Sequence, residues 1–229
     1  CVEKGGKVII PSFAIGRTQE IVFALNNFFN EGLLPRVNIY VDSPLAVNAT
    51  DIFRMHTDIL NKDVAEVMIS DPDPFGFNTL HYLKSPEESK KLNEIKKPCV
   101  IISASGMMEA GRIKHHLANN IENANNTILA VGYCSPNTLG ARILRGESEV
   151  SIFGVRHPVN ANIERIEAFS GHGDYNEMID YLSCQNASEI KKVFLVHGEY
   201  ESQLAYKKTL SANGYNSVEI PSAGESYTL

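Results

Sequence analysis

Short apolar runs alternate with longer amphipathic stretches through the first two-thirds of this 229-residue chain. The apolar runs occupy residues 7–12, 37–43, 99–105 and 127–133. Runs of this length are typical of strands that are buried on both faces of a parallel sheet, and the stretches between them are long enough to cross back as helices. The sequence therefore predicts an α/β fold, with a mostly parallel sheet and helices on both faces.

The first amphipathic stretch, residues 18–31, has the clearest helical periodicity. Its apolar residues fall on one helical face: Ile21, Val22, Leu25, Phe28 and Phe29. Thr18 is the expected N-cap of this helix, and Gly32 is the expected stop. Further helices are predicted over residues 44–60, 85–97 and 107–121.

The pattern changes near residue 147. Residues 149–158 and 162–169 alternate polar and apolar side chains in the manner of antiparallel strands, with a turn expected around Asn160. We place a boundary between two domains here, at 1–147 and 148–229. The elements predicted after these strands are a helix over 175–182, a strand over 191–197, a helix over 200–213, and short strands over 217–220 and 226–229.

Composition excludes some classes of protein. Lys and Arg number 21 against 27 acidic residues, so the net charge of −6 excludes nucleic-acid binding by bulk positive charge but leaves room for a local site. No apolar run approaches the ~18 residues of a membrane span, and no signal peptide is evident. The four cysteines form no C-x-x-C pair and fit reduced thiols. A cytoplasmic protein without a membrane partner is expected.

Three predicted strands end in turns of small and polar residues, PSFAIGRT, SASGMM and YCSPNTLGAR. In open parallel sheets, ligands bind beyond the carboxyl ends of the strands. Helix N-termini bind anions through free N–H groups, and Arg17 in the first turn adds a guanidinium fork for phosphate. Each turn alone is more simply explained as a chain reversal. Three in one sheet leave that explanation and a phosphate-lined cleft equally open.

Two histidines stand beside glycines directly after predicted strands. His172 lies in FSGHGD, and His197 lies in VHGE. Imidazole in such a position suits metal binding or proton transfer near neutral pH, but two buried histidines that end strands explain the spacing equally well. The other five histidines are interpreted as structural: His56, His81, His115, His116 and His157.

Six segments occur together and in order: GGKVIIPSFAIGRTQEIVFAL, YVDSPLA, SASGMMEAGRIKHHL, VGYCSPNTLGARIL, FSGHGDY and VFLVHGE. This series resembles the β-CASP family of metallo-β-lactamase-fold RNA nucleases, and SGHGD points to its prokaryotic cleavage-factor-like branch. The resemblance covers essentially the whole chain. It implies that residues 1–147 are most of a β-CASP domain and that 148–229 are the C-terminal αβ part of a metallo-β-lactamase domain.

The resemblance also implies roles for the two histidines. His172 matches a histidine that serves as general acid near the scissile phosphate, and His197 matches a ligand to one of two zinc ions. Asp174 matches no such role by itself. It is expected either to orient His172 or His197 through its carboxylate or to cap the helix that begins at Tyr175, and the cap is favoured.

The same resemblance points to contacts with the substrate. Ser103, Ser105, Gly106 and Met107 match a turn that lies over the active-site cleft, and Arg17 lies in the matching GRTQE turn. These residues are expected to contact the phosphate backbone of single-stranded RNA, in a cleft too narrow for a duplex.

The remaining metal ligands of the family, including an N-terminal HxHxDH signature, have no counterpart in this sequence. The chain is therefore expected to be the second half of a longer protein that holds two zinc ions. By itself it is expected to hold none, to be inactive, and to expose apolar strand surface that favours a homodimer.

Three functions compete. The favoured one is a fragment of a zinc-dependent RNA-processing nuclease, a phosphodiester hydrolase whose endonuclease or exonuclease action stays open. The second is a non-catalytic β-CASP scaffold subunit without a full metal site. The third, a small-molecule phosphate-binding α/β domain, gives no role to VHGE and would gain from a His197→Ala variant that left metal content unchanged.

Overall fold

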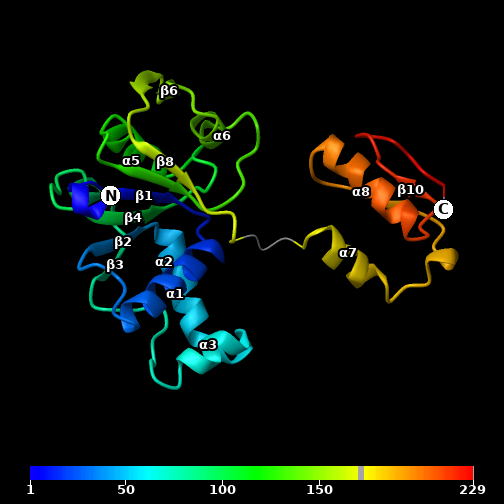
Figure 1. Ribbon diagram of the computed structural model, residues 1–229, viewed down its shortest axis with the longest axis horizontal. Coiled ribbons are helices and arrows are strands. Elements are labelled where there is room, and N and C mark those ends of the chain that lie inside the picture. Colours follow the sequence, from blue (N-terminus) through cyan, green and yellow to red (C-terminus); the bar gives the residue numbers. More distant parts are fainter. Residues whose placement is uncertain (170–172, 229) are drawn as a thin grey trace. The chain divides into compact units, whose positions relative to one another are not determined.

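The computed structural model describes residues 1–169 and 173–228. The chain divides into two compact units, Cys1–Phe169 and Ser170–Leu229. Figure 1 shows a central sheet between helices in the first unit and a smaller helix-rich group in the second. The two units are described separately below.

A six-stranded sheet organises the first unit. Its strand order is β3-β2-β4-β1-β5-β8, and every neighbouring pair is parallel. The predicted mostly parallel α/β sheet is therefore confirmed. The strands are β1 (Val8–Pro11), β2 (Asn38–Asp42), β3 (Leu80–Leu83), β4 (Cys99–Ser103), β5 (Thr127–Ala130) and β8 (Asn162–Arg165).

Helices cover both faces of this sheet (Figure 1). The central strand β4 is buried along its whole length, with Ile101 in one apolar cluster and Ile102 in the other. The first cluster packs under α5 and α6, and the second packs under α1 and α2. The helices are α1 (Arg17–Asn30), α2 (Pro44–Met55), α3 (Lys62–Val67), α4 (Pro86–Lys91), α5 (Ile113–Asn120) and α6 (Leu139–Leu144), with 3-10 turns η1 (Val2–Lys4) and η2 (Thr57–Ile59).

Several helix boundaries differ from the predicted ones. Gly16, not Thr18, is the N-cap of α1, and the Thr18 hydroxyl instead donates to the Phe13 carbonyl at 2.7 Å. The helix predicted from residue 107 begins only at Ile113, because residues 104–112 form a loop. The helix α2 ends at Met55, and β3 lies where the sequence predicts no strand. Short half-buried strands such as β3 carry too weak a pattern to be recognised.

The predicted pairing after residue 147 is wrong. The strands β6 (Glu149–Ile152) and β7 (Val155–Pro158) form their own antiparallel hairpin, which reverses at Phe153 and Gly154, both with positive φ. The following strand β8 does not pair with them and joins the sheet parallel to β5 instead. The amides of Asn160 and Ala161, at the expected turn, donate to the Ile121 carbonyl. Alternation identifies a strand but not its partner.

The second unit is smaller. It contains α7 (Tyr175–Leu182), the 3-10 turn η3 (Ala187–Glu189), β9 (Val193–Phe194), α8 (Tyr200–Ala212) and β10 (Val218–Glu219). The two strands are parallel neighbours, shorter than predicted, and residues 226–228 form no strand. A cluster of Tyr206, Leu210, Tyr215 and Val218 forms its core. The compact units divide after Phe169, so β8 belongs to the first unit although it follows residue 147.

Two expectations from composition concern the cysteines and membrane-spanning segments. All four cysteines are free thiols, with Cys99 and Cys134 buried and Cys184 exposed. Burial raises the pKa of both the Cys99 and the Cys134 thiols above the usual value, which keeps them protonated. Within the described part of the chain, no helix has the length and apolar character needed to cross a membrane.

Candidate functional site

The predicted turns lie at the carboxyl edge of the six-stranded sheet. The strands β1 and β4 are neighbours with Pro11 opposite Ser103, so the turns that follow them start side by side. The Ser12 amide donates to the Ser103 carbonyl at 3.0 Å. Beyond this contact, the Phe13 ring lies so close to Gly106 that a Cβ there would approach the ring to 3.0 Å. Glycine at position 106 is what lets these two turns meet.

The third predicted turn joins them. The Gly140 amide donates to the Met107 carbonyl at 3.2 Å, and the Cys134 thiol lies 3.8 Å from the Gly106 carbonyl. The Glu109 carboxylate accepts a hydrogen bond from the Leu139 amide at the start of α6. The structure therefore brings together the three turns that the sequence singled out, from strands that are adjacent in the sheet.

Arg17 is the first residue of α1. Its N-cap, Gly16, has φ +81 and no side chain with which to cap the helix. The Arg17 guanidinium lies 5.5 Å from the centre of the Phe169 ring and forms an ion pair with Glu20. With 16% of its side chain exposed, Arg17 is held in place by these contacts while still reaching the surface.

The loop of residues 104–112 is partly buried and partly exposed. The Ser105 amide donates to the Ala110 carbonyl, and the Met108 amide donates to the Ser105 carbonyl. Met108 is fully buried with φ 65, whereas Ser105, Gly106 and Met107 are partly exposed. The amides of Gly106 and Met107 form no hydrogen bond with any described residue. Two successive N–H groups of a partly exposed turn thus have no partner among the described residues, a pattern that occurs in anion-binding turns.

Ser103 is placed differently from these residues. It is 1% exposed, and its hydroxyl donates to the Asp42 carbonyl at 2.8 Å. Because Ser103 is buried, the structure does not support the predicted contact between Ser103 and phosphate. Its visible role is to join the end of β4 to the end of β2.

A buried polar cluster surrounds Asp42, the last residue of β2, and it was not predicted from the sequence. The Asp42 carboxylate is 0% exposed and accepts hydrogen bonds from Arg112 at 2.6 Å, Ser89 at 2.5 Å and His116 at 2.6 Å. Burial alone would raise the pKa of this carboxyl, but the hydrogen bonds from His116, Ser89 and Arg112 outweigh it and lower the pKa below the usual value. The available signal was an Asp at the end of an apolar strand and an Arg and a His four residues apart.

Two of the predicted residues of the second unit, Asp174 and His197, lie among the residues that the structure describes. His197 is exposed, with φ 67, in the segment between β9 and α8. Asp174 caps α7, because its carboxylate accepts from the amides of Asn176 and Glu177 at 2.8 and 2.9 Å. The favoured role of Asp174 as a cap is thus observed. His172 lies outside the described residues.

The described residues do not make a zinc site. No three His, Cys, Asp or Glu side chains in residues 1–169 and 173–228 are grouped closely enough to hold a metal ion. His197 offers one imidazole, whereas zinc sites in proteins use three or four protein ligands. The donor set present here therefore fits at most one position of such a site.

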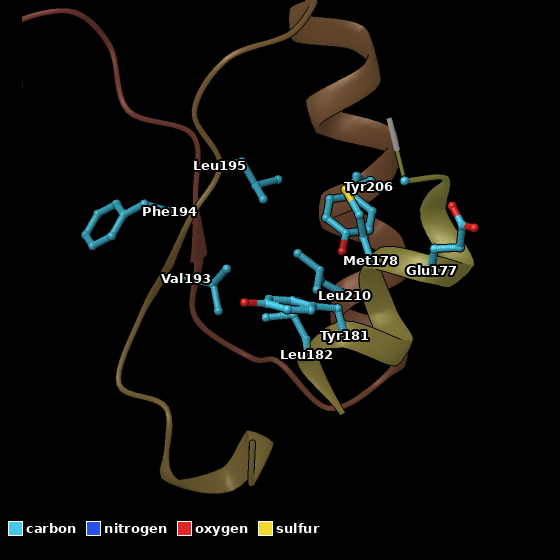
Figure 2. Close-up of a pocket in the computed structure, with 10 residues that line it drawn as sticks. Glu177, Met178, Tyr181, Leu182, Val193, Phe194, Leu195, Tyr206 and Leu210 are labelled. Carbon is cyan, nitrogen blue, oxygen red and sulfur yellow. The ribbon is translucent and has the colours of Figure 1, made fainter. Parts of the chain in front are cut away.

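An apolar cavity of about 460 Å³ lies within the second unit. Figure 2 shows Met178 and Leu182 of α7 facing Val193 of β9, with Leu210 of α8 between them. The Tyr206 hydroxyl is buried in this unit and has no hydrogen-bond partner among the described residues. The cavity has few polar groups, so it lacks the convergent polar side chains of a catalytic centre.

Comparison with known protein families gives two matches. The Beta-Casp domain matches residues 18–143, more than half of the chain, and the Zn-dependent metallo-hydrolase RNA specificity domain matches residues 156–221. The sequence families thus change between residues 143 and 156, whereas the compact units divide after Phe169.

Comparison with individual proteins agrees. Ribonuclease TTHA0252 of Thermus thermophilus is 35% identical over 213 residues, which cover 93% of this chain and 48% of the ribonuclease. The RNase J-like protein of Methanocaldococcus jannaschii is 34% identical over 96% of this chain and 48% of its own length. Transcription termination factor FttA of Methanosarcina mazei is 31% identical over 86% of this chain and 32% of its own length. The chain spans about half the length of the first two relatives, and it belongs to the β-CASP family of metallo-β-lactamase-fold RNA nucleases.

Proposed function

We propose that the chain is the RNA-contacting part of a zinc-dependent ribonuclease and that the carboxyl edge of its six-stranded sheet holds the backbone of single-stranded RNA. The observation that carries this proposal is the meeting of three turns at that edge, with two amides that form no hydrogen bond to a described residue and with the partly exposed guanidinium of Arg17. The names of the matching domain and relatives, which include RNA specificity and ribonuclease, support RNA as the ligand.

Each group has a defined task in this proposal. Arg17 donates to phosphate oxygens through its planar fork, and the amides of Gly106 and Met107 donate to an adjacent phosphate. The Ser105 hydroxyl, which accepts from the Ala110 amide at 3.3 Å, donates its own proton to the backbone of the RNA. A few local contacts of this kind are compatible with the net charge of −6, because they need no basic surface elsewhere.

Proton transfer is assigned to His172. In its protonated form it would donate a proton to the departing 3′-oxygen, which leaves a 3′-hydroxyl on one product and a 5′-phosphate on the other. General-acid assistance of this kind contributes about 10²–10⁴-fold in rate. Asp174, two residues further on, caps α7 and is available to orient a histidine only through the rest of its carboxylate.

His197 is proposed as one zinc ligand of a site that residues beyond the described part of the chain would complete. His197 is exposed, and a Cβ added at the neighbouring Gly198 would meet nothing within 4 Å, so this part of the chain is open to a metal ion. The four free thiols are compatible with the reducing cytoplasm, where we place the protein.

Binding of RNA tests the first part of the proposal. The chain is titrated into a fluorescein-labelled single-stranded RNA, and the dissociation constant is followed by fluorescence anisotropy. Arg17→Gln is expected to raise the dissociation constant about tenfold, because one phosphate loses its charged donor. Arg156→Gln is the control, since Arg156 is an exposed arginine with a single ion pair on the β6–β7 hairpin. Equal affinity of wild type and Arg17→Gln would contradict the assignment.

Cleavage tests the second part, and it requires the longer protein. His172→Ala is expected to lower the rate of cleavage of the same RNA by about 10²–10⁴-fold without changing its affinity. The exposed His56, at the end of α2, provides the control His56→Ala. RNA binding without any cleavage by the longer wild-type protein would favour the scaffold over the nuclease.

A further inference from the structure

Asp42 holds both ends of the loop of residues 104–112. At the start of the loop, the Ser103 hydroxyl donates to the Asp42 backbone carbonyl at 2.8 Å. At its end, Arg112 donates from Nη1 to the Asp42 Oδ1 atom at 2.6 Å. One residue at the end of β2 therefore fixes two points that are nine positions apart in the sequence.

Arg112 makes a second contact that a lysine would not make. Its Nη2 atom donates to the Lys84 carbonyl, just past β3, at 2.7 Å. The guanidinium thus spans the ends of β2 and β3 with two nitrogen atoms of one rigid plane. A lysine ammonium keeps the charge but is a single point at the end of a flexible stem, so it does not reproduce this bridge.

The other carboxylate oxygen of Asp42 is also engaged. Oδ2 accepts from the Ser89 hydroxyl at 2.5 Å and lies 2.6 Å from His116 Nε2. A carboxylate only accepts, so His116 donates from Nε2. The Nδ1 atom of His116 is buried without a partner among the described residues, which means that the ring is fixed from one side, by Asp42.

Stability is a poor explanation for this cluster. Buried ion pairs stabilise a fold little compared with apolar residues of the same volume, because both charges lose their hydration. In some proteins, a buried polar or ionic group is retained because it selects one conformation. The cluster lies where such specificity matters, since the loop between its anchored ends is neither helix nor strand and carries the partly exposed Ser105, Gly106 and Met107.

We propose that Asp42, Arg112 and His116 are positioning residues that hold the loop of residues 104–112 in the conformation that presents Ser105, Gly106 and Met107 to RNA. They do not touch the RNA themselves. This proposal rests on the proposed function, because it assumes that the carboxyl edge of the sheet is where RNA binds.

Arg112→Lys is the test variant, and Arg54→Lys is its matched control. Arg54 also binds an aspartate and a backbone carbonyl, donating to Asp73 at 2.9 and 2.8 Å and to the Phe75 carbonyl at 3.0 Å. It anchors a different loop, however, for which no RNA contact is proposed. In the anisotropy titration, Arg112→Lys is expected to raise the dissociation constant about tenfold, and Arg54→Lys less than about twofold.

Salt dependence distinguishes the loss of a charged contact with phosphate from the loss of the uncharged contacts that the loop of residues 104–112 makes. For single strands, the slope of log K against log salt concentration falls by about 0.7 for each phosphate that the protein no longer neutralises. Because Ser105, Gly106 and Met107 contact phosphate through uncharged donors, Arg112→Lys is expected to weaken binding without changing this slope, whereas Arg17→Gln, which removes a cation, is expected to reduce it by about 0.7. His116→Gln retains a donor in place of Nε2 and is expected to bind RNA as wild type does, whereas His116→Ala is expected to resemble Arg112→Lys.

Amide hydrogen exchange measures how firmly the loop of residues 104–112 is held, and the measurement needs no RNA. The amides of Ser105, Met108 and Ile113 close the loop by bonds to Ala110, Ser105 and Ala104. Their exchange is expected to quicken at least tenfold in Arg112→Lys. In Arg54→Lys, the faster exchange should be confined to residues 71–78. If Arg112→Lys does not fold, it is replaced by Ser89→Ala, which removes one hydrogen bond to Asp42 and leaves Arg112 and His116 in place.

The outcomes distinguish this proposal from the proposed function. If Arg17→Gln weakens binding but Arg112→Lys binds and exchanges as wild type does, the positioning role is overturned and the RNA site stands. If wild type binds no RNA, the proposed function fails. In that case, unchanged exchange in Arg112→Lys would also show that Arg112 does not hold the loop of residues 104–112. Faster exchange would show that Arg112 holds the loop, but the role of the loop in presenting residues to RNA would be refuted.

Discussion

At the scale of single residues, the buried carboxylate of Asp42 shows how charge is tolerated in the interior of this fold. Three donors, from Ser89, Arg112 and His116, converge on its two oxygen atoms. Their combined effect lowers the pKa of Asp42 in the folded chain in spite of its burial. The carboxylate is therefore ionised under all ordinary conditions, and removing it leaves buried donors unsatisfied.

This arrangement predicts how stability depends on pH. The folded pKa of Asp42 lies below the unfolded value of about 3.9, so its stabilisation is complete above that pH and is lost as the pH falls through the folded pKa. Asp42→Asn is expected to lower the free energy of unfolding at pH 7 by about 3–5 kcal/mol. The difference from wild type should shrink below about pH 4.

Urea unfolding followed by circular dichroism at pH 7 and pH 3 measures this difference. Asp63, an exposed aspartate in the first turn of α3, provides the control Asp63→Asn. A constant difference between Asp42→Asn and wild type at both pH values would show that Asp42 is not the titrating group.

His116 illustrates what sequence can say about a single residue. Interpreting it as structural rather than catalytic is compatible with its position, 1% exposed and bound to Asp42. Its partner, 74 residues away, could not be identified from local pattern. Arg112, the N-cap of α5, and His116 are four residues apart and therefore lie on one side of the helix, but this spacing does not identify the residue that they both contact.

At the scale of elements, the turns that follow β1 and β4 pack closely against each other at the carboxyl edge of the sheet. A Cβ at position 106 would lie 3.0 Å from the Phe13 ring and 3.3 Å from the Phe13 backbone nitrogen. The ring can turn aside, but the backbone nitrogen cannot move without shifting the turn after β1. Glycine at this position is thus a packing requirement and not a requirement of φ.

Gly106→Ala is therefore expected to push the two turns apart. We expect a decrease of about 1–3 kcal/mol in the free energy of unfolding and weaker binding of single-stranded RNA. Gly132→Ala is the matched control, because a Cβ at position 132, on the turn after β5, meets nothing within 4 Å. Denaturant unfolding and anisotropy of both variants give the comparison. Equal behaviour of the two would show that the contact with Phe13 is not limiting.

The elements also show where local pattern fails. The helix α7 has the predicted bounds, because Asp174 and Glu177 form a capping box that is visible in the sequence. The predicted start of α5 is six residues early, because the apolar Met107 and Met108 resemble a helix start. In the structure Met108 turns into the core with a positive φ instead. Tertiary burial of one side chain overrides helical propensity there.

At the scale of the whole molecule, the chain consists of two compact units with separate cores. Leu210 is fully buried in the second unit beside its apolar cavity, and Leu117 is fully buried in the first. Because each unit buries its own apolar cluster, each core is expected to open independently of the other.

Leu210→Ala is expected to destabilise the second unit by about 2–5 kcal/mol. Hydrogen exchange should then quicken in residues 173–228 and stay unchanged in β4. Leu117→Ala, the matched variant, should have the opposite effect, with faster exchange in the first unit alone. Equal loosening of both units by either variant would mean that they unfold as one.

The sequence by itself determined the alternation of strands and helices, the mostly parallel sheet, the family and the turns that end its strands. These features are local, because periodicity and glycine placement act over a few residues. Only the tertiary structure decided that β8 returns to the sheet, that three turns meet at one edge, and that Asp42 gathers partners 47 to 74 residues away. Such contacts depend on which elements pack together. The local sequence around an aspartate is the same whether its carboxylate contacts water or contacts an arginine and a histidine in the core.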